Sequence, residues 1–173
     1  MINRKCCYFT EGQCEERLVR ALKLKPALLI PGKVKTFNVV QNVLPISILM
    51  TIEPGSMVVL VFDTDTGNVD ILNKNIEFLK QQSAVEDIIC ITQIENLEDE
   101  LVRSTSIKEI KELTKSRTNS EFKKDVLHIS NLKKRMEECS FDFSEFWSSK
   151  PKDRYKHLNN EADKIKKNNC YGK

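Results

Sequence analysis

The stretch Met57-Val58-Val59-Leu60-Val61-Phe62-Asp63-Thr64-Asp65 decides the fold. It has an uninterrupted apolar run, rich in β-branched residues, that ends in a turn carrying two carboxylates. Such a short run predicts a β-strand. Because it has no polar alternation, it is typical of a parallel strand that is buried on both faces. Asp63 and Asp65 are therefore expected at the carboxyl edge of a parallel sheet, where open α/β sheets bind their ligands.

A second strand is predicted over residues 5–10, and Glu11-Gly12 follows it directly. If the two strands are neighbours, Glu11 converges with Asp63 and Asp65 at the same edge of the sheet. Three carboxylates at one point repel each other unless a hard cation lies between them. Mg²⁺ is the usual cation for such oxygen ligands.

The remaining pattern favours an α/β fold in which helices flank a parallel sheet. Residues 27–40 are expected to form two short extended pieces around Pro31-Gly32. A helix is expected to begin near Leu44, with Pro45 in its first turn. The other expected elements are helices over 13–23 and 69–82 and a strand over 87–92.

The 173 residues are expected to divide into three parts. Residues 1–102 are the predicted catalytic α/β domain. Residues 103–149 are a mostly helical, basic extension packed on it, with a short helix over 106–114 and a longer helix over 122–139. Another short helix is expected over 97–102, at the end of the first part. Residues 150–173 have few apolar anchors and are expected to form a basic, flexible tail. The aromatic run Phe141–Trp147 either closes the main core or docks a partner.

The charge pattern favours a polyanionic partner, although the net charge is only +3. Residues 86–100 contain six acidic and no basic side chains, whereas residues 103–135 contain ten basic and four acidic ones. A metal site that acts on nucleic acid would combine such an acidic centre with basic flanks. The alternative is a set of solvated helix faces. The candidate phosphate contacts are Lys33, Lys35, Arg103, Lys108, Lys111, Lys115, Arg117, Lys123 and Lys124.

Several other classes of protein are not favoured. No apolar run is long enough to span a membrane, and the first residues lack the apolar segment of a signal peptide, so we expect a cytoplasmic protein. The six cysteines form no CxxC pair, which argues for free thiols rather than zinc. The Asp63 turn lacks the spacing of a calcium loop, and Pro31-Gly32-Lys33 is not a phosphate-binding P-loop.

The motifs Thr10-Glu11-Gly12-Gln13-Cys14-Glu15 and Val61-Phe62-Asp63-Thr64-Asp65 together resemble the Toprim domain. That domain is shared by topoisomerases, bacterial primases, OLD-family nucleases, RloB-type proteins and small ribosomal-RNA maturases. The resemblance covers about residues 5–100. It implies a Toprim-like sheet, a nuclease-type activity and Mg²⁺ or Mn²⁺ as the cofactor.

The resemblance also implies roles for individual residues. Glu11 would be a general acid/base or a metal ligand, Asp63 and Asp65 would bind the metal, and Glu15 would be a second acidic residue of the catalytic site. An acidic residue after the next strand often completes the metal site of the nuclease branch, and here Glu95 and Glu98 both qualify.

The expected function is therefore Mg²⁺-dependent cleavage of DNA or RNA phosphodiester bonds. An alternative is an effector or toxin subunit of a phage-defence complex that is regulated by an ATPase partner, as in OLD- and RloB-type systems. A third is a phosphate or nucleotide site that does not cleave, although the phosphatases and receivers of this kind carry an aspartate where Glu11 stands. The substrate and the choice between monomer and homo-oligomer stay open.

Overall fold

The computed structural model describes residues 5–65 and 69–167. Residues 66–68, which follow Asp65 in the sequence, and residues 168–173 of the predicted tail lie outside that range. The elements are β1 (Lys5–Thr10), α1 (Gln13–Leu22), β2 (Gly32–Thr36), α2 (Ile46–Leu49), β3 (Ser56–Asp63), α3 (Asp70–Lys80), β4 (Val85–Gln93), α4 (Leu97–Arg103), α5 (Lys111–Thr114), η1 (Asn119–Glu121), α6 (Phe122–His128), α7 (Leu132–Glu138), η2 (Asp153–Tyr155) and η3 (Ala162–Lys164).

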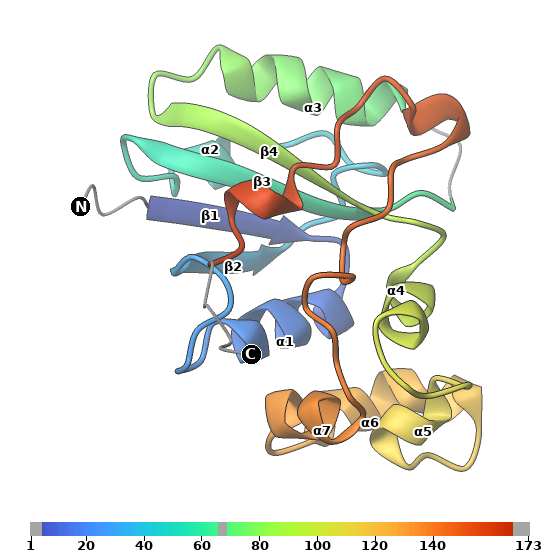
Figure 1. Ribbon diagram of the computed structural model, residues 1–173. Coiled ribbons are helices and arrows are strands. Elements are labelled where there is room, and N and C mark those ends of the chain that lie inside the picture. The colour runs from blue at the N-terminus through green and yellow to red at the C-terminus, as the bar shows by residue number, and fades with distance from the viewer. Residues whose placement is uncertain (1–4, 66–68, 168–173) are drawn as a thin grey trace.

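The four strands form one parallel sheet in the order β2-β1-β3-β4, which confirms the predicted α/β class. β1 and β3 are direct neighbours, with Thr10 opposite Val61. β3 and β4 end together, since Asp63 is opposite Gln93. The segments after these strands therefore leave the sheet at one edge (Figure 1).

Alternate residues of the strands face two separate apolar layers. Tyr8, Val59 and Ile91 pack with α1 and with the helices of the basic extension. Phe9, Leu60 and Phe62 pack on the other face, with α2 and α3. Figure 1 shows α1 and α3 on opposite sides of the sheet, and α5 to α7 beyond α1. Both faces are covered, which explains why the strands are apolar almost throughout.

The basic extension differs in detail from the sequence prediction. The expected helix over 122–139 is two helices, α6 and α7, because Asn131 caps α7 by accepting a hydrogen bond from the backbone N of Lys134 at 3.0 Å. Within 106–114, only Lys111–Thr114 is helical. Phe146 and Trp147 are buried in the α1-side core, which agrees with core closure by the aromatic run.

The described part of the predicted tail packs on the sheet and has more apolar anchors than the sequence suggested. Tyr155 is buried against Phe62, with 5.9 Å between the ring centroids. Farther along, Leu29 and Lys166 form an isolated antiparallel bridge, and Ile165 is fully buried. This segment passes back over the sheet from the carboxyl edge (Figure 1). Among the described residues, no helix is both long and apolar enough to cross a membrane.

Candidate functional site

Glu11 joins the ends of three strands. One of its carboxylate oxygens, Oε2, accepts a hydrogen bond from the backbone N of Asp63 at 3.0 Å. The other, Oε1, accepts one from Asn38 Nδ2 at 2.5 Å. Asn38 lies just after β2, so Glu11 links the residues that follow β1 and β2 to the last residue of β3. The predicted convergence of Glu11 and Asp63 is present.

The loop that carries Asn38 is fixed by a buried asparagine of α3. Asn75 Oδ1 accepts a hydrogen bond from the backbone N of Leu44, and Asn75 Nδ2 donates to the carbonyl oxygens of Val39 and Asn42, each at 2.8 Å. Asn75 is fully buried. The conformation of the loop, and with it the partner of Glu11, therefore depends on a side chain from a distant helix.

Asp63 has the most perturbed carboxylate at this edge. Burial raises its pKa to about 9, and Glu11, Glu15, Asp65 and Glu98 add to the rise in that order. Asp63 Oδ1 is buried and has no hydrogen-bond partner among the described residues. A buried carboxylate without a partner costs free energy whether it is charged or neutral. Asp63 Oδ1 is thus an oxygen of the site that has no hydrogen-bond partner among the described residues.

Glu15 lies in the first turn of α1 and is largely buried. Burial is the main cause of its raised pKa, and Glu11 and Glu98 contribute. A Cβ on Gly12 would lie 2.9 Å from Glu15 Oε2, so a side chain at position 12 would displace this carboxylate. Glycine between Glu11 and the helix therefore allows Glu15 to fold back over the strand end.

The remaining acidic candidates differ in their surroundings. Asp65 is exposed, two residues beyond Asp63. Glu98, at the start of α4, is half-buried; it affects the pKa values of Asp63 and Glu15 and pairs with Lys123 at 3.2 Å. Glu95 is exposed in a left-handed turn with a φ of 65°. Of the two residues that the sequence left open, Glu98 is the one with an electrostatic effect on Asp63.

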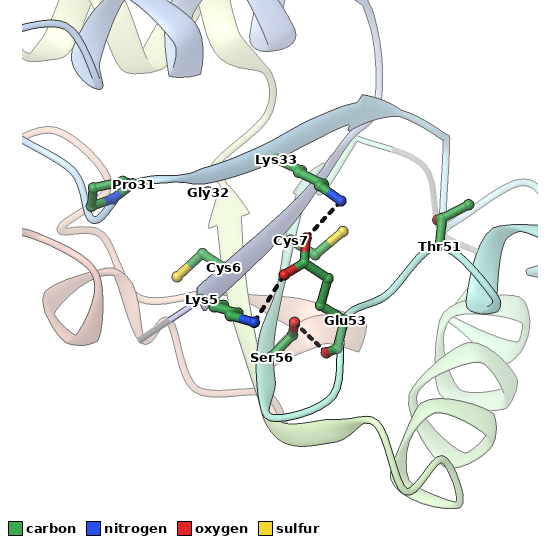
Figure 2. Close-up of a pocket in the computed structure, with 9 residues that line it drawn as sticks. All are labelled: Lys5, Cys6, Cys7, Pro31, Gly32, Lys33, Thr51, Glu53 and Ser56. Carbon is green, nitrogen blue, oxygen red and sulfur yellow. Dashed lines mark hydrogen bonds and ion pairs between the residues drawn. The ribbon is translucent and has the colours of Figure 1, made fainter. Parts of the chain in front are cut away.

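Lys33 lies at the wrong edge of the sheet for this site. It is opposite Cys7 near the start of β1 and pairs with Glu53 at 2.7 Å, and Lys5 pairs with the same carboxylate at 3.0 Å. Figure 2 shows both lysines directed at Glu53 in a hollow at the amino ends of the strands. The carboxyl end of β2 is three residues away, or about 10 Å.

The other basic candidates are spread over the surface. Lys35 contacts the hydroxyl of Thr51, Arg103 pairs with the buried Glu100, and Lys111 pairs with Glu109. Lys123, through Glu98, is the candidate that is tied to the acidic cluster. Among the described residues, the exposed candidates that form no ion pair are Lys108, Lys115, Arg117 and Lys124.

A second hollow, of about 210 Å³, lies at the carboxyl edge itself. Thr64, Ile94 and Glu95 line it from the ends of β3 and β4, and the segment Lys152–Tyr155 lines it from the C-terminal part. Lys152 and Arg154 bring positive charge to this hollow beside Thr64, next to the acidic side chains of Glu95 and Asp153. These two residues were not among the predicted phosphate contacts, because the sequence of this segment predicted a flexible tail.

The side chains at this edge offer the type of oxygen ligand that a hard divalent cation prefers. The candidate ligands are carboxylate oxygens, which Mg²⁺ and Mn²⁺ prefer, and Asp63 Oδ1 is buried without a partner. As they stand, however, no three His, Cys, Asp or Glu side chains of residues 5–65 and 69–167 are grouped closely enough to hold a metal ion. Both Glu11 oxygens already accept hydrogen bonds.

The five cysteines within the described range are free thiols. In comparisons with known proteins, no family model, no curated protein and no solved structure matches this chain. The Toprim resemblance is therefore a hypothesis that depends on the motifs and on the arrangement of the strand ends.

Proposed function

We propose that this protein is a Mg²⁺- or Mn²⁺-dependent nuclease that cleaves phosphodiester bonds at the carboxyl edge of its sheet. The observation that carries the proposal is Asp63: a partly buried carboxylate with one buried, unpartnered oxygen, under the electrostatic influence of four other acidic side chains. Carboxylates are brought together in this way at sites that bind cations. A structural salt bridge would instead have given Asp63 a basic partner.

Asp63, Asp65 and Glu98 would hold the cation. When bound, the ion would supply Lewis-acid stabilisation of the charge that develops on the phosphate oxygens. Glu11 would act mainly through position, because its two oxygens hold the backbone of Asp63 and the side chain of Asn38. It would keep the Asp63 carboxylate aimed at the site.

Glu15 would be the general acid or base of the reaction. Its burial raises its pKa, so it holds a proton more readily than an exposed glutamate does. A carboxyl whose pKa is shifted towards neutrality suits general acid or base catalysis on the attacking or the leaving oxygen. Its folded-back position over Gly12 places it at the same strand end as Glu11.

Basic residues on both sides of the acidic cluster would bind the nucleic-acid backbone. Lys123 lies on α6, and Lys152 and Arg154 line the hollow beside Thr64 and Glu95. Such contacts position phosphates without reading the sequence of bases. The proposal therefore includes binding that weakens as the salt concentration rises.

The test is a cleavage panel of supercoiled plasmid, single-stranded DNA and total tRNA with the purified chain. Each substrate is incubated with Mg²⁺, Mn²⁺ or EDTA, and products are resolved on gels. Cleavage that needs the cation supports the proposal and identifies the substrate class. A folded protein that cuts none of the three with either ion, or that cuts equally well in EDTA, would contradict it.

A further inference from the structure

A second unpartnered polar side chain lies beside Asp63. Gln93, the last residue of β4, is fully buried, and neither its Oε1 nor its Nε2 has a hydrogen-bond partner among the described residues. A primary amide offers two donors and an acceptor, and burying it without partners is unfavourable. Such a group needs an explanation.

The register of the sheet directs Gln93 to the same side as Asp63. The two residues are opposite each other in the parallel pair β3–β4, where neighbouring strands are about 5 Å apart. Two residues earlier, Val61 and Ile91 both pack in the α1-side core. Because side chains alternate along a strand, Asp63 and Gln93 also point to the α1 side. Glu15 comes to the site from that helix.

The polar groups around Gln93 are already used by other partners. The backbone N of Ile94 donates to Glu100 Oε1 at 2.9 Å, and the carbonyl oxygen of Gln93 itself accepts from the N and Oγ1 of Thr64. On the α1 side of this edge, the buried oxygens without a partner among the described residues are Asp63 Oδ1 and Gln93 Oε1. Two oxygen acceptors side by side are what a cation or its bound water would join.

We infer that Gln93 is a further residue of the proposed metal centre. Its Oε1 coordinates the divalent cation held at Asp63, either directly or through a water bound to the ion. The inference rests on the proposed function. It assigns to β4 a neutral donor that shares the cation with the carboxylates of β3 and α4. It also explains why a costly amide is retained in a buried strand.

Three variants test the inference, with Mn²⁺ as the probe and binding followed by electron paramagnetic resonance and calorimetry. Gln93→Met keeps the approximate size of the side chain and removes its polar atoms. Gln93→Glu places a charged oxygen at the same position. Thr92→Val is the matched control, because Thr92 is also fully buried with an unpartnered Oγ1, but it alternates to the other face of the sheet.

We expect Gln93→Met to raise the dissociation constant for Mn²⁺ by roughly 10- to 100-fold, the range seen when groups that support a metal site are removed. In EDTA the same variant should melt at a higher temperature than the wild type, because the unpartnered amide is gone. Gln93→Glu should bind Mn²⁺ more tightly than the wild type, and Thr92→Val should bind it equally well.

Equal Mn²⁺ affinity in Gln93→Met, Thr92→Val and wild type would overturn the inference and leave the proposed function standing. If Gln93→Met does not fold, Gln93→Glu decides, and affinity that is unchanged or weaker would overturn the inference. A wild type that binds no Mn²⁺ would overturn the proposed function and the inference with it.

Discussion

The buried asparagine of α3 provides the sharpest prediction about the scaffold. Asn75→Leu keeps the approximate volume of the side chain but removes all its hydrogen-bonding atoms. Three backbone groups then lose their partner: the N of Leu44 and the carbonyl oxygens of Val39 and Asn42, each now 2.8 Å from the amide. Because Asn75 is fully buried, water does not readily replace it.

The expected cost follows from these three groups. Leaving a buried backbone group unsatisfied costs at least about 1 kcal/mol, so the free energy of unfolding should fall by about 3 kcal/mol. For a chain of this size that loss corresponds to a melting temperature lower by roughly 6–12 °C. The loop would also release Asn38, the partner of Glu11 Oε1. Cleavage should therefore fall even at temperatures where the variant is folded.

Urea unfolding followed by circular dichroism measures this cost. The control is Asn73→Leu on the same helix, whose partly exposed amide makes a long contact of 3.4 Å with His157. The control should lie within about 0.5 kcal/mol of the wild type. A loss below about 1 kcal/mol in Asn75→Leu, or an equal loss in both variants, would refute the role given to Asn75.

Three further predictions concern other sites. In EDTA, the pKa of Asp63 is about 9 in the folded chain against a reference value of 3.8, so the native state holds a proton that the unfolded state has released. As the pH rises between these two values, the wild-type free energy of unfolding should therefore fall by up to about 1.4 kcal/mol per pH unit. Asp63→Asn should flatten that slope in urea titrations at several pH values. Glu100→Ala should cost at least about 2 kcal/mol in calorimetry, because the backbone N–H groups of Ile94 and Trp147, which donate to Glu100 at 2.9 and 3.2 Å, lose their acceptor; a cost below about 1 kcal/mol would contradict that role. Gly32→Ala should lower the melting temperature because the new Cβ would lie 2.3 Å from the carbonyl oxygen of Cys6; an unchanged temperature would show that β2 can shift freely.

The main strands and the acidic edge could be predicted because their signals are local. The predicted strands over 5–10, 57–62 and 87–92 correspond to β1, β3 and β4, with small differences at the ends. Each is buried on both faces and therefore reads as a continuous apolar run. The turn residues that follow such runs lie at the carboxyl edge, so the position of Glu11 and Asp63 at this edge needed no long-range information. Their approach to each other also depends on the pairing of β1 with β3.

β2 was less clear because, unlike β4 at the other edge of the sheet, it is mostly not buried. Only Val34 of its five residues is buried, so Lys33 and Lys35 weaken the apolar pattern. Two extended pieces were predicted there, whereas one strand forms after Pro31. The break between α6 and α7 did have a local signal, since Ser130-Asn131 before Leu132 is a typical helix start.

Asn38, Gln93 and the segment Lys152–Tyr155 could not be assigned to the site from the sequence. Their roles depend on contacts across long separations: Asn38 with Glu11, Gln93 with β3, and Tyr155 with Phe62. No periodic pattern marks an isolated polar residue as buried, and a single tyrosine in a polar tail gives no sign that it packs. Tertiary structure was needed to place all three.

The most direct test of the account is the single-turnover cleavage rate in Mg²⁺, on the substrate that the panel identifies, for the wild type, Asp63→Asn and Asp99→Asn. Asp99 is the control because it is an exposed aspartate in the first turn of α4. The account predicts that Asp63→Asn folds and loses cleavage by at least about 100-fold, the scale for removing a group that stabilises the transition state, while Asp99→Asn cleaves like the wild type. Cleavage by a folded Asp63→Asn at the wild-type rate would contradict the assignment of the site.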